Sequence, residues 1–215
     1  MSGTKHLEPP PWLYAWMAQG SVMRLIYRRF IKEVAERVPP GGRFLDVGTG
    51  PGYLLGQLAR VRPDLKLWGL DFSCDMIRRA RLRPSPPAGP PGWVVADACR
   101  LPFAAGVFDH AVATLSFHIW PCPVAGLKEL VRVLAPGGRA WVYELRRDAG
   151  VGDLQAFARE TRLSFGLVYL GYHVVRWHHA LSEAHFAHVL RQAVGVRGTL
   201  RPVQHIFWRG ELAGV

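Results

Sequence analysis

Short apolar runs alternate along this chain with segments in which apolar positions recur every three or four residues. Apolar runs of four to eight residues bounded by Gly, Pro or Asp predict buried strands, whereas the three- and four-residue period predicts amphipathic helices. Strands are predicted in this way at residues 43–47, 66–70, 93–96, 108–114 and 138–145. Helices are predicted between them at residues 52–61, 73–83 and 124–134. This alternation predicts a parallel sheet with helices on both faces.

The segments on either side of this core are predicted to be mostly helical. Residues 12–38 carry a helical pattern, in one helix or in two that meet near Gly20, and the three prolines that end residues 1–11 predict a loose arm. After the core, helices are predicted at residues 152–165 and 182–193, separated by an apolar stretch for which the pattern defines no form. Strands at residues 195–201 and 203–208 predict a closing antiparallel hairpin.

The composition is that of one globular unit. The chain has 215 residues, of which 49% are hydrophobic, so we expect a single domain over residues 1–215. Within it we distinguish an N-terminal arm with helices (1–40), a core (41–146), and lid helices with a C-terminal hairpin (147–215). Three widely spaced cysteines form no disulfide framework, and neither a secretory signal nor a transmembrane segment is apparent, so we expect a cytoplasmic location.

The net charge of +11 comes mostly from arginine and attracts anions such as nucleic acid, acidic lipid headgroups or an acidic substrate. The arginines are scattered and form no long basic block. We therefore expect most of them to lie on solvated faces.

The segment F-L-D-V-G-T-G-P-G-Y-L, at residues 44–54, is the strongest single signal in the chain. A buried strand that carries Asp46 ends in a tight turn with Gly48, Gly50 and Gly52, which lets a ligand approach the backbone closely. The spacing G-x-G-x-G differs from the G-x-G-x-x-G of dinucleotide-binding dehydrogenases. A glycine-rich turn that binds nothing remains the alternative at this point.

Further motifs follow in order. Asp71 ends the second predicted strand, the stretch S-x-x-M follows at residues 73–76, and Asp97-Ala98 follows the third strand. Residues 127–138 read L-K-E-L-V-R-V-L-A-P-G-G. Together with the glycine segment, these motifs resemble those of the class I S-adenosylmethionine-dependent methyltransferases, over nearly the whole chain after Pro40. The resemblance implies an α/β fold, namely a Rossmann-like doubly wound seven-stranded sheet, mostly parallel with an antiparallel C-terminal strand, preceded by N-terminal helices.

The resemblance also implies S-adenosyl-L-methionine as cofactor and S-adenosyl-L-homocysteine as product. A carboxylate at Asp71 is placed to accept hydrogen bonds from both ribose hydroxyls, while Asp97 and the N–H of Ala98 would hold the adenine. Met76 would pack on the adenine face, although an ordinary core methionine is nearly as good an interpretation. The expected cofactor-binding residues are Asp46, Gly48, Thr49, Gly50, Gly52, Asp71, Phe72, Met76, Asp97, Ala98, Thr114 and Leu115.

The acceptor pocket is expected beyond the fourth strand, in residues 114–123. His118 is the candidate general base because the pKa of histidine lies near operating pH, and a positioning or packing role for it is equally open. Trp120 is expected to be a pocket wall, and Tyr14, Tyr27 and Tyr53 are candidates to cover the cofactor or the acceptor. The substrate-site candidates are thus Tyr14, Tyr53, His118 and Trp120.

Several other chemistries are disfavoured by the residues present. The fourth strand is followed by T-L-S-F-H-I and not by the N-P-P-Y-like turn of amine-methylating nucleic-acid enzymes, and Cys122 lies too far past the strand end for a nucleophile. The same loop carries no acid, so we predict no metal. The group His178, His179, His185 and His188 lacks a cysteine or carboxylate partner, so we expect these histidines to be solvated.

The sequence therefore predicts an enzyme that transfers a methyl group to a small-molecule acceptor, similar to the quinone- and lipid-methylating branch, at an O, C or N atom that stays open. An RNA methyltransferase that uses the basic surface is the alternative enzyme. A non-catalytic S-adenosylmethionine-binding protein is the alternative from another class, because fold does not fix activity.

Overall fold

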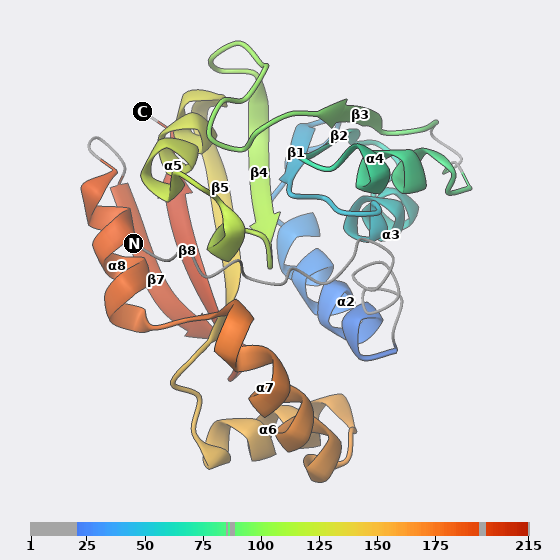
Figure 1. The fold of residues 1–215 in the computed structure, drawn as a ribbon. Coiled ribbons are helices and arrows are strands. Elements are labelled where there is room, and N and C mark those ends of the chain that lie inside the picture. The colour runs from blue at the N-terminus through green and yellow to red at the C-terminus, as the bar shows by residue number, and fades with distance from the viewer. Residues whose placement is uncertain (1–20, 85, 87–88, 194–196, 215) are drawn as a thin grey trace.

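The computed structural model describes residues 21–84, 86, 89–193 and 197–214 (Figure 1). Its centre is a mixed sheet of order β3-β2-β1-β4-β5-β8-β7, with the two-residue strand β6 beside β5. Strands β1 to β6 pair in parallel, whereas β8 is antiparallel to both β5 and β7. The strands are β1 Arg43–Val47, β2 Lys66–Asp71, β3 Gly92–Val95, β4 Phe108–Thr114, β5 Leu134–Arg146, β6 Ala180–Leu181, β7 Arg197–Val203 and β8 Phe207–Ala213. The predicted α/β sheet, mostly parallel with an antiparallel C-terminal strand, is confirmed, and β6 adds an eighth strand.

Most of the described helices begin and end close to where the sequence pattern places them. They are α2 Ser21–Ala35, α3 Tyr53–Val61, α4 Cys74–Arg81, α5 Pro123–Arg132, α6 Val151–Thr161, α7 Phe165–His179 and α8 Glu183–Gln192, with a 3-10 turn η1 at Phe117–Ile119. Ser73, Ser164 and Ser182 each cap a helix by accepting a hydrogen bond from the N–H three residues later. These serines explain where α4, α7 and α8 begin.

The apolar strands bury side chains on both faces of the sheet. On β5, Trp141 and Tyr143 pack into the core that contains α2, α3, α6 and α7, whereas Ala140 and Val142 pack into the core that contains α5 and α8. Successive side chains of a strand point to opposite faces, so a continuous apolar run supplies two cores. The sheet is therefore a central layer with helices on both sides (Figure 1).

In the C-terminal part, the structure defines one segment that the sequence left open and corrects one prediction. The apolar stretch for which the pattern defines no form is the helix α7. The second strand of the closing hairpin was expected at residues 203–208, but β8 begins only at Phe207. Gln204 and His205 adopt φ angles of 47° and 68°, so they form the turn between β7 and β8.

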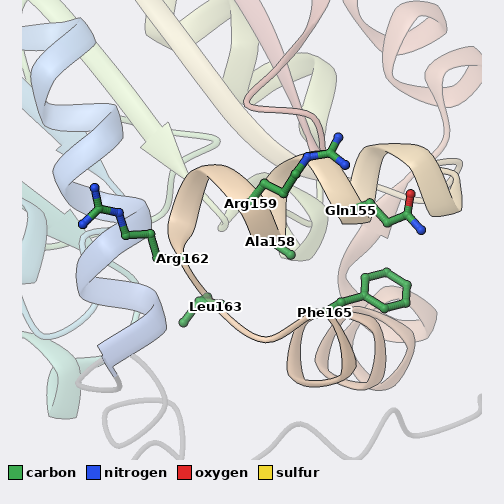
Figure 2. Close-up of a pocket in the computed structure, with 6 residues that line it drawn as sticks. All are labelled: Gln155, Ala158, Arg159, Arg162, Leu163 and Phe165. Carbon is green, nitrogen blue, oxygen red and sulfur yellow. The ribbon is translucent and has the colours of Figure 1, made fainter.

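Helices α6 and α7 lie beyond the sheet edge at which β4 ends (Figure 1). Between α6 and the start of α7 the surface has a hollow of about 490 Å³. Its lining residues, shown in Figure 2, are Gln155, Ala158, Arg159, Arg162, Leu163 and Phe165. The hollow contains none of the residues predicted to bind the cofactor.

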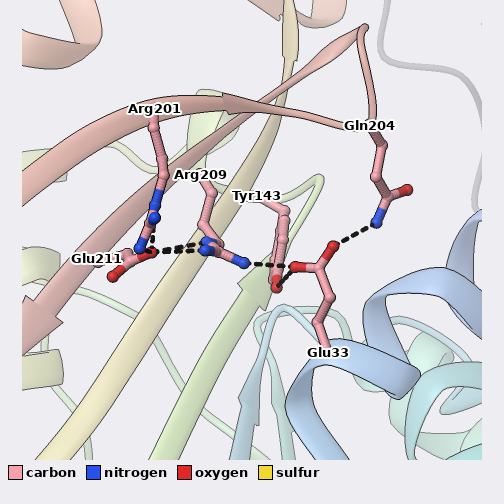
Figure 3. Close-up of polar contacts among 6 residues, drawn as sticks. All are labelled: Glu33, Tyr143, Arg201, Gln204, Arg209 and Glu211. Carbon is pink, nitrogen blue, oxygen red and sulfur yellow. Dashed lines mark hydrogen bonds and ion pairs between the residues drawn. The ribbon is translucent and has the colours of Figure 1, made fainter.

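A polar network ties α2 to the C-terminal strands (Figure 3). Glu33 on α2 accepts hydrogen bonds from Tyr143 at 3.1 Å and from the Gln204 amide at 3.0 Å, and it forms an ion pair with Arg209. Arg209 also contacts Glu211 through its Nε at 2.9 Å. Burial, followed by the charge of Glu33, holds the pKa of Tyr143 far above its ordinary value, so its hydroxyl remains a donor. The network fixes α2 relative to β5 and β8.

Candidate functional site

The glycine-rich turn joins β1 to α3 at the carboxyl edge of the sheet. A Cβ at Gly48 would lie 2.3 Å from the Cβ of Ser116, and one at Gly52 would lie 2.5 Å from the ring of Trp93. These two glycines are therefore required by packing. At Gly50, where φ is 54°, a Cβ would meet nothing within 4 Å, so this backbone faces open space that a ligand can use.

Asp46 and Thr114 bring polar atoms to the ends of the adjacent strands β1 and β4. Asp46 is buried and accepts a hydrogen bond from the Thr49 hydroxyl at 2.7 Å. Burial raises the pKa of Asp46 to about 7, although the bond from Thr49 opposes this. Within the described part of the chain, Oδ1 of Asp46 and the hydroxyl of Thr114 are buried without a hydrogen-bond partner. Such atoms are rare in folded proteins, and here they can serve a polar ligand.

Asp71 lies at the end of β2 and faces the glycine-rich turn. One carboxylate oxygen accepts the N–H of Gly50 at 2.8 Å and the other accepts that of Ser73 at 2.9 Å. Burial raises the pKa of Asp71, and the two backbone bonds oppose this. Each oxygen keeps further acceptor capacity for a hydroxyl group. The next residue, Phe72, leaves 78% of its surface exposed beside this carboxylate.

The remaining cofactor candidates lie in the turns near the same strand ends. Asp97 accepts the N–H of Cys99 at 2.8 Å, and its neighbour Ala98 is buried. Met76 is buried on α4, so the exposed apolar ring in this region belongs to Phe72. Leu115 adopts a φ of 54° and donates its N–H to the carbonyl of Tyr143 at 2.9 Å.

His118 lies in η1, directly after β4. Its Nδ1 is 3.0 Å from Oε2 of the buried Glu144 on β5. The other oxygen of Glu144 accepts the backbone N–H groups of Phe117 at 2.6 Å and of His118 at 3.2 Å. Burial lowers the pKa of His118, but the charge of Glu144 and the hydrogen bond to it outweigh burial, so the net shift is upward. A carboxylate only accepts, so Nδ1 carries the hydrogen and Nε2 of the neutral ring has the lone pair.

The lone-pair side of His118 faces a second histidine. Its Nε2 lies 2.8 Å from Nδ1 of His179, the last residue of α7, and the two rings meet edge to face. The prediction that His179 is solvated is therefore wrong, because it is half-buried and bonded to His118. His185 and His188 are exposed, as expected, and the side chain of His178 lies outside the described residues. The sequence does not indicate the contact of His179 with His118, because the two residues are 61 positions apart and α7, which carries His179, shows no clear period.

The other substrate-site candidates are placed differently. Trp120 is buried between η1 and α5, where its ring packs edge to face on Phe117 and against Gly126. Tyr53 is half-buried at the start of α3 with the guanidinium of Arg83 stacked 3.9 Å from its ring centre. Burial, and then the charge of Asp46, raises the pKa of Tyr27 on α2, so this hydroxyl also lies in the field of that acid. Tyr14 lies outside the described residues.

The residues at this edge fit S-adenosylmethionine. Gly50 offers open space, Asp71 offers acceptors for hydroxyls, and Asp46 and Thr114 have buried atoms to satisfy. In the described residues no three His, Cys, Asp or Glu side chains are grouped so that they could hold a metal ion, and the expected absence of a metal stays a prediction.

Comparisons with known proteins agree with this assignment. Residues 45–142 match the family described as Methyltransferase domain. The demethylmenaquinone methyltransferase of Thermus thermophilus is 34% identical over 145 residues, which are 67% of this chain and 60% of the relative. A ubiquinone/menaquinone biosynthesis C-methyltransferase of Geotalea daltonii is 34% identical over 55% of this chain and 51% of the relative. The chain thus spans about half to three fifths of the length of these curated relatives.

Solved structures show the same fold. A SAM-dependent methyltransferase from Aquifex aeolicus superposes with a TM-score of 0.67 at 20% identity, over 97% of this chain and 100% of that one. The fold is that of class I S-adenosylmethionine-dependent methyltransferases, and the sequence match to the Methyltransferase domain family covers the core of the sheet, residues 45–142. None of its described helices is long and apolar enough to cross a membrane.

Proposed function

We propose that this chain methylates a small aromatic acceptor that carries an ionisable hydroxyl, such as a reduced quinone, with His118 as the general base. The observation that carries the proposal is the pair of His118 and Glu144, at the sheet edge that also holds the glycine-rich turn. The names of the quinone-methylating relatives support the acceptor class. Loss of the hydroxyl proton makes both the oxygen and the ring carbons nucleophilic, so a base serves O- and C-methylation alike.

The residues of this chain bind the cofactor and move a proton. The bound cofactor supplies an activated methyl group for in-line displacement. Gly50, Asp71, Asp97 and Ala98 would hold its nucleoside part, and Asp46 and Thr114 would meet its other polar groups. Held at the strand ends and in the turns that follow them, these residues would position the cofactor against the acceptor and exclude water.

His118 and His179 together would carry the acceptor's proton. With Nδ1–H of His118 bonded to Glu144, its Nε2 accepts a hydrogen bond from Nδ1–H of His179. In the proposed reaction the hydrogen-bonded pair of His118 and His179 takes up the hydroxyl proton, which ends on Nε2 of His118. The imidazolium that forms on His118 is stabilised by the carboxylate of Glu144. The proton returns to solvent after the product has left.

The RNA acceptor that the sequence left open is not proposed, because the relatives named above are quinone methyltransferases. The cytoplasmic location stays a prediction.

The test is methyl transfer from isotopically labelled S-adenosylmethionine to a panel of reduced quinones, phenols and amines, with RNA as a further acceptor. We expect label in a hydroxylated aromatic product with the wild type. We also expect loss of at least roughly two orders of magnitude in kcat with His118→Ala or His179→Ala, with binding of S-adenosylhomocysteine retained. Asp71→Asn is the matched control, since it should weaken cofactor binding first. Transfer to none of the acceptors, with S-adenosylhomocysteine still bound, would instead identify a non-catalytic binding protein.

A further inference from the structure

Helix α7 presents an apolar face to solvent. Leu167, Leu170 and Val174 are 54%, 66% and 66% exposed, and their spacing places them on one side of the helix. Phe165 and Tyr169 add exposed aromatic surface. Residues 163–175 contain no Asp, Glu, Lys or Arg. A surface helix normally turns charged and polar residues outward, so this face is suited to burial against a partner.

Two cations border this face. Arg159 and Arg162 line the hollow between α6 and the start of α7 together with Phe165 (Figure 2). Both arginines are exposed, and the ion pairs within the described residues include neither of them. Guanidinium groups bind phosphate oxygens through paired hydrogen bonds. The two guanidinium groups point in different directions (Figure 2), so each can meet a separate phosphate next to the apolar surface.

We propose that α7 and this hollow form a docking surface for a membrane that contains anionic phospholipids. Leu167, Leu170 and Val174 enter the boundary of the acyl chains, while Arg159 and Arg162 bind headgroup phosphates. Apolar residues on one helix face beside cations are the chemistry of interfacial helices, and the net charge of +11 adds attraction to an anionic surface.

The charges favour a lipid surface over other occupants. Burying this face in a second copy through a two-fold contact would bring Arg159 and Arg162 of both copies to one interface, and residues 163–175 offer no acid to pair with them. A nucleic acid would use the arginines but would leave the apolar stripe in water. Phospholipid satisfies both features at once.

Docking would place the membrane close to the proposed base. Leu170 and His179 lie on the same helix, nine residues apart by number, which is roughly 14 Å along its axis. If the proposed function holds, this short distance gives an apolar acceptor a direct path from the lipid to His118.

The test is sedimentation of the full-length chain with vesicles of phosphatidylcholine alone or mixed with phosphatidylglycerol. We expect binding to the mixed vesicles that weakens as salt rises. Leu170→Glu with Val174→Glu should weaken it at least about tenfold, and Arg159→Gln with Arg162→Gln by roughly fivefold for each arginine. Leu82→Glu is the matched control, because Leu82 is 80% exposed at the end of α4, away from this surface.

Failure would take a distinct form. Absence of wild-type binding to the mixed vesicles overturns the proposal, as does equal loss in Leu82→Glu. A lowered unfolding temperature of the Leu170/Val174 variant would show that the face packs within the chain, and a wild-type dimer that this variant dissociates would assign it to a second copy. Methyl transfer to a water-soluble acceptor should be unchanged in all variants, so a failure here leaves the proposed function to its own test.

Discussion

Nδ1 of His118 lies 3.0 Å from a carboxylate oxygen of Glu144, which joins the turn after β4 to the buried strand β5. The other oxygen of Glu144 accepts two backbone N–H groups of the same turn. One buried carboxylate thus positions the turn, orients the imidazole and sets its tautomer. The predictions below start from this pair and from the acids and glycines beside it.

Glu144→Gln should abolish base catalysis without unfolding the chain. The amide oxygen can still accept the N–H groups of Phe117 and His118, which turns the amide nitrogen toward Nδ1 of His118 as a donor. Neutral His118 would then carry its hydrogen on Nε2 and could not accept a proton there. We expect kcat to fall by roughly two to four orders of magnitude, with a normal dissociation constant for S-adenosylhomocysteine. An unchanged kcat would show that the pair is only structural.

The pH profile of kcat/KM should rise with pH through a pKa above the ordinary 6.5 of histidine. The base is active when neutral, and Glu144 raises the pKa of His118, so activity appears only above that raised value. The contribution of His118 to the free energy of unfolding changes with pH in the opposite direction. Protonated His118 contributes its full stabilisation below the unfolded pKa, and this is lost as pH rises through the folded pKa. The pKa of Asp46 is raised to about 7, so this acid titrates in the same pH range. Asp46→Asn is therefore the control variant, and its kcat/KM should still rise with pH. A limb at or below pH 6 would contradict the assignment.

Asp46→Asn should stabilise the free protein at alkaline pH. Burial raises the folded pKa of Asp46 to about 7, above an unfolded value of about 3.9. The folded state therefore binds the extra proton between these values, and the free energy of unfolding falls as pH rises through this window. We expect the variant to gain roughly 2–4 kcal/mol at pH 8, and little near pH 4. Urea unfolding at both pH values measures this, and equal stability of the two proteins at pH 8 would refute it.

Gly50→Ala should weaken cofactor binding by more than its loss of folding stability can account for. Its φ of 54° costs an alanine about 1–2 kcal/mol, and the added Cβ enters the open space that the cofactor would use. Gly137→Ala is the matched control, since Gly137 has a φ of 77° and equally open surroundings near the start of β5. Thermal unfolding should show similar losses for both variants. Calorimetric titration with S-adenosylhomocysteine should show at least about tenfold weaker binding for Gly50→Ala only, and equal weakening in both would point to general loosening.

The parts predicted well depend on local chemistry. Strand β1 spans Arg43–Val47 as expected, and Asp71 ends β2, because a buried strand in a parallel sheet is a continuous apolar run closed by glycine or an acid. The start of β8 was misplaced because Gln204 and His205 adopt positive φ angles that glycine or asparagine usually signals. The sequence pattern does not assign helix α7, because its apolar residues lie on all sides of the helix and show no three- or four-residue period.

By itself, then, the sequence determined the α/β fold, the glycine-rich turn and the order of the acids along the sheet edge, since each follows from the spacing of neighbouring residues. Only the tertiary structure decided that Glu144 and His179 meet His118 from β5 and from the end of α7. It also decided that Trp120 packs in the core and that the apolar face of α7 is exposed. These contacts join residues far apart in the chain, and packing, which no local period records, brings them together.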